Sequence, residues 1–249
     1  AAEKERMAAY GADMNKYLDS GNEARIKKAY ESRDPRLQMA VITPYAQYNG
    51  ASSGIAHTYT LRWPYRGSDS AEPFDIRTDT NDKFYYLWRK FVPEGLEQTE
   101  RDTYGLDIPL IRYAEVLLLK AEALNEWGST HESEAIRCVN EVRRRAGHVE
   151  LNNATYPATK VNGQSDLRER IRNEYYWEIG GEDSMYFHEL RWGTWKDKKF
   201  DNNRNGLMQM WGETTYTWYW LGDQCWSWPI PAKEMEMNSN LEQNEGWIN

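Results

Sequence analysis

The sequence has few of the features that define several common protein classes. Its 249 residues include only two cysteines, Cys138 and Cys225, which is too few for a disulfide-stabilised scaffold. No run approaches the roughly 20 apolar residues that a membrane-spanning helix needs. It has no starting methionine, no basic segment followed by an apolar one and no N-terminal cysteine for lipidation. We therefore expect a fragment or a processed form without signal peptide or lipid anchor.

Positive charge and catalytic motifs are also scarce. The 31 basic residues are outnumbered by 39 acidic ones, for a net charge of −8, which argues against binding to a phosphate backbone and so against nucleic acid. We find no phosphate loop, nucleophile elbow or EF-hand. The histidines are scattered and form no zinc motif; they are His57, His131, His148 and His188. We expect neither metal nor cofactor.

Residues 109–147 predict two helices joined by a short turn. Pro109 suits a first helical turn, and apolar residues then recur at threes and fours on one face: Leu110, Tyr113, Leu117, Ala121 and Leu124. Gly128 suits the end of this helix. Ser129, Thr130 or Ser133 is expected to cap the second helix, whose predicted buried stripe is Ala135, Ile136, Val139, Val142 and Ala146, ending at Gly147. Cys138 lies beside this stripe, so we expect a free core thiol.

The rest of the chain alternates between helix and irregular segments. We predict helix over 1–33, with a break at Gly21-Asn22 and an end at Asp34, and an irregular region over 38–106 with short strands at 39–42 and 84–91. Asp166 and Glu169 predict a capping box for a helix that buries Leu167, Ile171, Tyr175 and Ile179. A short helix is expected at 186–192, an irregular region at 196–228 and an extended tail thereafter.

Aromatic residues are abundant, and most carry a polar edge: 12 Trp and 17 Tyr against 5 Phe. Such rings can stack on the apolar face of a sugar while neighbouring polar groups bond its hydroxyls. We predict a ligand site in the 45–66 loop, formed by Tyr45, Tyr48, Asn49, Tyr59, Trp63, Tyr65 and Arg66. For the aromatic 211–228 segment we favour packing or a protein interface over ligand binding.

Several segments, in order along nearly the whole chain, resemble the C-terminal half of the SusD/RagB family of outer-membrane nutrient-binding lipoproteins. They are Arg33-Asp34-Pro35-Arg36-Leu37, Arg89-Lys90-Phe91, Pro109–Leu118 with Ala121-Glu122-Ala123, Val139–Arg143 with Arg145-Ala146-Gly147, Arg191-Trp192, and Pro229-Ile230-Pro231 with Gln243-Asn244. The resemblance implies a single mostly α domain over 1–249, in which tetratricopeptide-like helical hairpins support long, irregular, aromatic-rich loops.

The resemblance also implies a function. It predicts a cell-surface protein of polysaccharide utilization that binds glycan or other nutrients without catalysis and delivers them to a SusC-type TonB-dependent transporter. It also implies contact with the membrane only through an N-terminal lipid anchor, which we do not expect within this chain. The chain departs from the family pattern around the last long helix, where it has Tyr175, Ile179, Asp183, Met185 and His188 in place of the usual Arg, Leu, Gly, Arg and Asp. These departures predict a depleted internal ionic network.

Two alternatives remain. One is a helical-repeat adaptor that binds another protein. The other is a glycan hydrolase that uses Glu174 and Glu178, which lie one helical turn apart. We favour structural ion pairing for these two glutamates, because arginines are available as partners on the same helix and in the helical pair. The candidate partners are Arg170 and Arg172, or Arg112 and Arg143.

Overall fold

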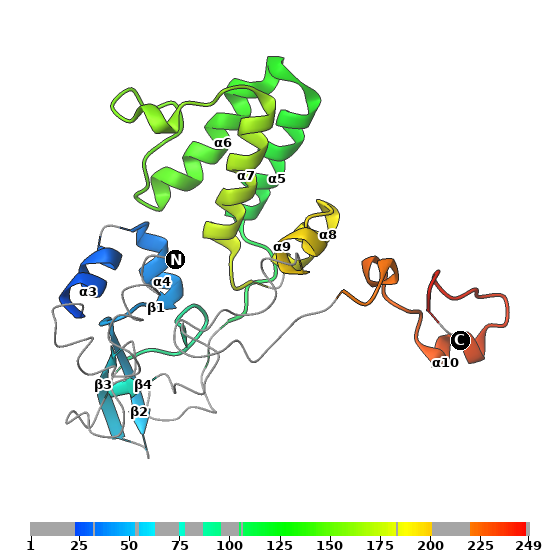
Figure 1. The fold of residues 1–249 in the computed structure, drawn as a ribbon, viewed down its shortest axis with the longest axis horizontal. Helices are drawn as coiled ribbons and strands as arrows, with labels where there is room; N and C mark the ends of the chain where they lie inside the picture. The colour runs from blue at the N-terminus through cyan, green and yellow to red at the C-terminus, as the bar shows by residue number, and fades with distance from the viewer. Residues whose placement is uncertain are drawn as a thin grey trace, which may run out of the picture. The chain divides into compact units, whose positions relative to one another are not determined.

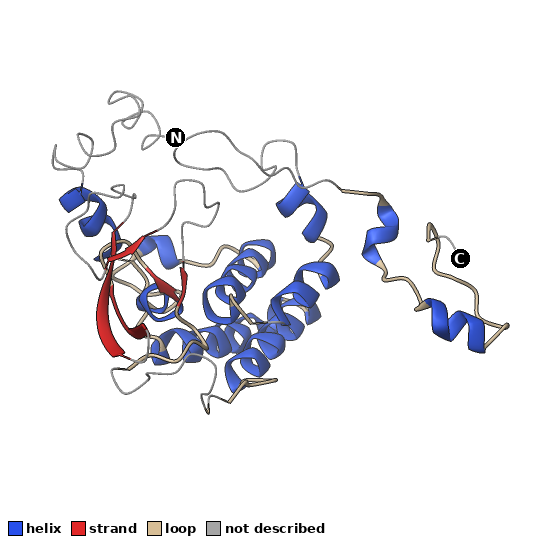
Figure 2. Cartoon of the chain, turned by 90° about the horizontal axis from the view of Figure 1, so that it is seen from below, coloured by secondary structure: helices blue, strands red, loops and turns tan. Residues whose placement is uncertain are grey.

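The computed structural model describes residues 23–31, 33–52, 55–62, 75–77, 87–95, 105, 107–182, 184–200 and 220–247 (Figure 1). The chain divides into two units, Ala1–Met185 and Tyr186–Asn249, which are considered separately. Helices dominate the described residues (Figure 2), as predicted. None of the described helices is long and apolar enough to cross a membrane. The predicted helix over 1–22 lies outside these residues.

Three helices form the core of the first unit: α5 (Tyr113–Trp127), α6 (Glu132–Arg145) and α7 (Gln164–Ile179). They lie side by side in Figure 1, and the short 3-10 helix η2 (Ser129–His131) joins α5 to α6. Apolar side chains from all three are fully buried, namely Leu118, Ala121, Ala135, Val139, Leu167, Ile171 and Ile179. The predicted αα-hairpin is therefore confirmed, and α7 completes its core.

The start of the helical pair differs from the prediction. Leu110 and Tyr113 are exposed instead of buried, and α5 begins only at Tyr113. Arg112 takes an extended conformation (φ −108°, ψ 149°), because its guanidinium reaches the end of α7, where it bonds Glu178 and Glu182. That tertiary contact overrides the local helical pattern.

The predicted caps are also wrong. No side chain of Ser129, Thr130 or Ser133 caps α6, whose N-cap is His131. The helix α7 begins at Gln164 after Gly163, and Asp166 lies within its first turn, where it accepts the Asn162 N–H at 2.8 Å. The ends were better predicted. Gly147 (φ +71°) follows α6, and Gly181 (φ +82°) follows α7 and its C-cap Gly180, where a left-handed backbone favours glycine.

The buried faces of α6 and α7 agree with the apolar stripes that the sequence predicts. The predicted stripe of α7 is fully buried, including Tyr175, and the predicted stripe of α6 is buried except for Ala146 at the C-cap. Cys138 is buried in α6 and free, and Cys225 in the second unit is also free.

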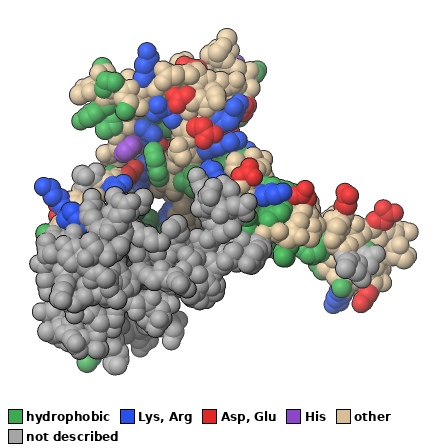
Figure 3. Space-filling view, in the orientation of Figure 1, with side chains coloured by type: hydrophobic (Ala, Val, Ile, Leu, Met, Phe, Trp, Pro, Cys, Tyr) green, Lys and Arg blue, Asp and Glu red, His purple; other side chains and the backbone are tan. Residues whose placement is uncertain are grey.

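The loop between α6 and α7 holds the short 3-10 helix η3 (Pro157–Thr159). Apolar side chains gather on that loop in Figure 3, with Tyr156 exposed.

Short helices and strands precede the helical cluster. Asp34 does not end a helix; it caps α4 (Pro35–Ala40), and α3 (Glu23–Glu31) ends before it. The strands β1 (Val41–Ile42) and β5 (Leu87–Trp88) pair antiparallel, within the two segments predicted as strands but shorter than expected. A second sheet contains β2 (Gln47–Ser52), β3 (Ile55–Arg62) and β4 (Asp75–Arg77). Its β2–β3 hairpin replaces the irregular loop expected there.

The second unit has short helices around an aromatic cluster. The helix α8 (Ser184–Arg191) begins at the end of the first unit, and it is followed by α9 (Trp195–Phe200), the 3-10 helix η4 (Asp223–Trp226) and α10 (Ala232–Met237). Ring centroids lie 4.8 Å apart for Tyr186 and Trp195 and 5.0 Å apart for Trp220 and Trp226. These contacts fit the favoured packing interpretation. The predicted irregular region at 196–228 is wrong at its start, where α9 forms, and the predicted extended tail is wrong where α10 forms. Residues 201–219 lie outside the described residues.

Candidate functional site

The β2–β3 hairpin brings aromatic side chains onto one face. Its antiparallel register places Tyr48 opposite Tyr59 and Gly50 opposite His57. Because side chains alternate between the faces of a strand, these four positions share one face. The His57 and Tyr59 rings meet edge to face, with centroids 6.0 Å apart. The hairpin therefore presents three rings around a glycine.

Gly50 makes room for these rings. A Cβ added at Gly50 would lie 2.6 Å from the Tyr48 ring and 3.5 Å from that of Tyr59, which is closer than any side chain tolerates in the first case. The Tyr48 ring is held at its far end as well, because its hydroxyl donates to the Pro93 carbonyl at 2.8 Å. The aromatic face is thus fixed by the glycine below it and by the segment after β5.

The opposite face of the hairpin is polar. The Thr58 hydroxyl donates to the Asn49 side chain at 2.8 Å, and the Asn49 N–H donates to Glu94 at 3.3 Å. Arg89 donates to the Glu94 carboxylate, to the Gln47 carbonyl and to the Gln38 carbonyl. These bonds join the hairpin to α4 and to the segment that follows β5. The polar face is used for structure.

Four of the seven predicted ligand residues lie in the described part of the chain. Tyr48, Asn49 and Tyr59 belong to the hairpin, and Tyr45 precedes it with a left-handed φ of 65° and its N–H bonded to the Leu61 carbonyl at 2.7 Å. Trp63, Tyr65 and Arg66 lie outside the described residues. The sequence prediction of this site did not include His57 or Glu94. The Ser53-Gly54 turn signal, followed by the alternating pattern of 55–62, would have indicated a hairpin that contains His57.

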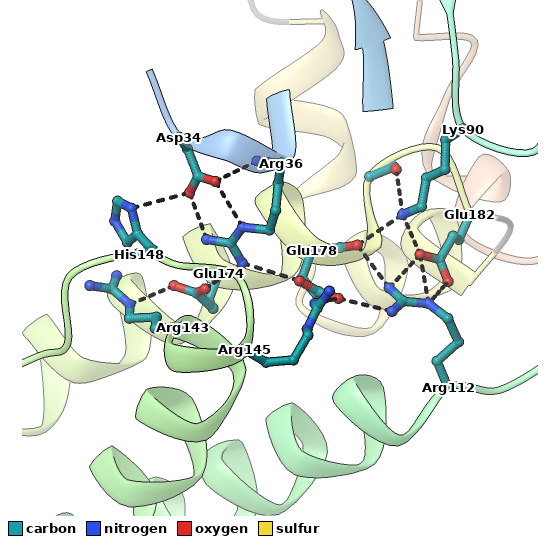
Figure 4. Close-up of polar contacts among 11 residues, drawn as sticks. Asp34, Arg36, Lys90, Arg112, Arg143, Arg145, His148, Glu174, Glu178 and Glu182 are labelled. Carbon is teal, nitrogen blue, oxygen red and sulfur yellow. Dashed lines mark hydrogen bonds and ion pairs between the residues drawn. The ribbon is translucent and has the colours of Figure 1, made fainter. Parts of the chain in front are cut away.

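A second polar cluster surrounds Glu174 and Glu178 at the end of α7 (Figure 4). The Glu174 carboxylate accepts from Arg36 at 2.6 Å and from Arg143 at 2.7 Å. The Glu178 carboxylate accepts from Arg112 at 2.9 Å, from Arg36 at 3.2 Å and from Arg145. Both glutamates are buried, so their charges depend on these arginines.

The cluster extends in two directions. Glu182 bonds Arg112 and Lys90, and Lys90 also donates to the Glu178 carbonyl at 2.9 Å and to the Gly180 carbonyl at 3.3 Å. On the other side, Asp34 pairs with Arg36 at 2.7 Å and lies 3.4 Å from His148. The predicted depletion of the ionic network is therefore wrong: arginines of α4 and α6 and at the N-cap of α5 supply the cations that α7 lacks.

Neighbouring arginines lower the pKa of two carboxyl groups in the cluster, Glu178 and Asp34. Burial by itself raises the pKa of Glu178, but hydrogen bonding from Arg112 and the charges of Arg145 and Arg112 hold its pKa below the usual value. The pKa of Asp34 is lowered in the same way, against the effect of burial, by Arg36. Burial lowers the pKa of His148, which favours its neutral form. A general acid needs a raised carboxyl pKa, and Glu178 has the opposite.

Structural ion pairing of Glu174 and Glu178 is thus confirmed. Of the four partners considered, Arg112 and Arg143 are correct. The other two bond elsewhere on α7, Arg170 to Asp166 at 2.9 Å and Arg172 to Glu169 at 3.6 Å. Arg36 and Arg145 were not foreseen as partners. Among the described residues no group of three or more His, Cys, Asp and Glu side chains could hold a metal ion.

The first unit therefore combines a cluster of helices, which buried arginine–glutamate pairs hold together, with a small sheet that presents aromatic rings. Comparison with known proteins identifies the family: residues 9–247 match the model of the SusD family, and the chain belongs to it. It is 28% identical to the starch-binding protein SusD of Bacteroides thetaiotaomicron over 161 residues, 64% of this chain and 25% of that protein. It is 32% identical to the SusD-like protein P38 of Formosa agariphila over 139 residues, 55% of this chain and 24% of that protein.

The fold agrees with this assignment. A crystal structure of a SusD-like protein from Bacteroides fragilis superimposes with a TM-score of 0.59 and 23% identity, covering 88% of this chain and 40% of that one. The chain thus spans about a quarter of the length of the curated relatives it matches.

Proposed function

We propose that this protein binds glycan nutrients at the cell surface and delivers them, without catalysis, to a SusC-type TonB-dependent transporter of the outer membrane. The observation that carries the proposal is the aromatic face of the β2–β3 hairpin, where Tyr48 and Tyr59 pair across the strands above Gly50. Rings of this kind stack on the C–H face of a pyranose. A relative of this chain is named for starch binding, which supports a carbohydrate as the ligand.

Binding without turnover is supported by the state of the acidic residues. Glu174 and Glu178 lie in one ionic cluster and are bonded by four arginines, which come from α4, the N-cap of α5 and α6. A glycosidase needs one carboxyl that holds a proton and another that faces the sugar. These two carboxyls are instead occupied by guanidinium groups. The adaptor alternative is supported less well, because an aromatic hairpin face suits a sugar ring.

The test is calorimetric titration of the full-length protein with a panel of neutral and acidic oligosaccharides. We expect one glycan class to bind at micromolar to millimolar strength, and Tyr59→Ala to weaken that binding about tenfold, because stacking of one ring contributes on the order of 1–1.5 kcal/mol. The matched control is Tyr156→Ala, which removes an exposed tyrosine from the loop between α6 and α7. Trp63→Ala tests the remainder of the predicted loop.

Two outcomes would contradict the proposal. If no glycan binds, the ligand is of another class. If the oligosaccharides are shortened during incubation and a Glu174→Gln variant that circular dichroism shows to be folded has lost that activity, the protein is a hydrolase. Equal affinities for Tyr59→Ala and Tyr156→Ala would retain glycan binding but remove the hairpin face as its site.

A further inference from the structure

A cavity of about 210 Å³ opens beside the ionic cluster in the first unit. Its lining comes from five places in the chain: α4, the segment after β5, the N-cap of α5, the end of α6, and α7. The lining residues are Arg36, Met39, Ala40, Lys90, Arg112, Arg145, Trp177 and Glu178. Pockets that bury drug-sized ligands usually measure roughly 300–1,000 Å³. This cavity therefore suits a single sugar unit or a smaller group.

The charge of the cavity wall is positive. Four of its lining residues are cations and only Glu178 is an anion. Within the whole cluster, five cations face four carboxylates, since Arg143 joins the four lining cations and Asp34, Glu174 and Glu182 join Glu178. His148, at the edge of the cluster, has a lowered pKa. The cluster thus lacks one negative charge.

Arg145 is the cation with the most hydrogen-bonding capacity left over. Its guanidinium bonds Glu178 through one terminal nitrogen, and its side chain is 58% exposed. A guanidinium has five N–H donors in a planar fork that matches a carboxylate or a sulfate. Arg36 and Arg112, by contrast, each bond two or more carboxylates. The donors of Arg145 are therefore the ones that an incoming anion would meet.

An apolar surface adjoins this cation. Trp177 projects from α7 with 45% of its surface exposed, and Met39 and Ala40 at the end of α4 complete the rim. An acidic sugar has the matching composition, a C–H face beside a negative group. A simple inorganic anion would use Arg145 but not the indole.

We propose that this cavity binds one acidic sugar unit, with its carboxylate or sulfate on Arg145 and its ring against Trp177. The inference rests on the proposed glycan binding, and it narrows the ligand to glycans that contain anionic units. It places that subsite at the junction of α4, α6 and α7, separate from the aromatic face of the hairpin.

The experiment compares digalacturonate with the neutral disaccharide in which each carboxylate is replaced by a hydroxymethyl group, using titration calorimetry on the full-length protein. We expect only digalacturonate to bind with measurable affinity at low salt, and about tenfold weaker binding for Arg145→Gln, the loss expected for one charge-assisted hydrogen bond. Trp177→Ala should weaken binding by a similar factor. The affinity for digalacturonate should fall when the salt concentration is raised from 20 mM to 500 mM, because salt screens the exposed pair of Arg145 and the sugar carboxylate.

Arg144→Gln is the matched control, since Arg144 lies next to Arg145 on α6, is 64% exposed and pairs with Glu150 outside the cavity. The Arg145 variant should remain folded, because Glu178 retains Arg36 and Arg112; thermal unfolding checks this. A sulfated galactose disaccharide distinguishes the two anions, and binding of either acidic sugar supports the proposal. The proposal is overturned if neither acidic sugar binds, or if the Arg145→Gln and Arg144→Gln variants bind digalacturonate with the same affinity. Neutral glycan binding that depends on Tyr59 would then leave the proposed function standing.

Discussion

The Arg143 guanidinium donates to the Glu174 carboxylate across 2.7 Å, and the two side chains are 5% and 0% exposed. The pair joins α6 to α7 in the interior of the first unit. Arg36 approaches the same carboxylate from α4, so one glutamate connects three helices. Because removing one partner leaves a buried charge without compensation, this position is the most sensitive in the cluster.

We expect Glu174→Gln to lower the free energy of unfolding by about 3–5 kcal/mol, the usual cost of breaking a buried ion pair. Urea denaturation followed by circular dichroism measures it. The control is Glu169→Gln on the same helix, whose side chain is 60% exposed and should change stability by no more than about 0.5 kcal/mol. Equal stabilities of the two variants would show that the Glu174 pairs contribute nothing.

Acid should destabilise the protein through Glu178. Its pKa in the folded state lies below the ordinary value of 4.5, so the unfolded chain takes up a proton first as the pH falls. The stabilisation is complete above about pH 4.5 and is lost as the pH falls through the folded pKa. We expect the urea midpoint to decline as the pH falls below about 4.5, and Glu178→Gln to flatten that decline. A wild-type midpoint independent of pH in this range would contradict the assignment.

Gly50 should not tolerate a side chain. In Gly50→Ala the new methyl group would lie 2.6 Å from the Tyr48 ring, forcing that ring away from Gly50 and from the Pro93 carbonyl. Overpacking of this kind costs about 1–3 kcal/mol, and we also expect weaker glycan binding. Gly105→Ala is the control, since nothing lies within 4 Å of its Cβ position. Thermal unfolding and calorimetry compare them; unchanged values for Gly50→Ala would show that the rings are not held over Gly50.

The two thiols should differ in reactivity. Cys138 is fully buried, and burial raises its pKa, so little thiolate is present or accessible. Cys225 is partly exposed. Iodoacetamide followed by mass spectrometry should therefore label Cys225 in the native protein and Cys138 only after addition of urea. Equal labelling rates without denaturant would mean that α6 opens readily.

The sequence predicted well the elements that depend on local periodicity. The stripe of α7 is buried as its spacing indicates, and most of the stripe of α6 is as well, because helical spacing alone determines which residues share a face. Predictions failed where a distant partner decides the local conformation. Arg112 bonds Glu178 and Glu182, which lie 66 and 70 residues away. Helix α5 therefore begins only at Tyr113.

The candidate site was predicted in part. Turn residues in the 45–66 segment indicated an excursion from helix, yet the pairing of Tyr48 with Tyr59 follows from a register that only the folded hairpin defines. The cavity beside Arg145 was not predicted at all. Its wall combines residues from position 36 to position 178, and single-sequence periodicity carries no information on such separations.

The bond between Arg36 and Glu174 spans 138 positions in the chain, and this separation has a consequence for the order of folding. The hairpin of α5 and α6 closes over a short turn, whereas the contact between α4 and α7 is non-local, and contacts of this kind slow folding. During synthesis α4 leaves the ribosome first and finds its partner last. Until α7 has been made, the Arg36 guanidinium has no Glu174 to bond, whereas Arg143 of α6 lies only 31 positions from that glutamate.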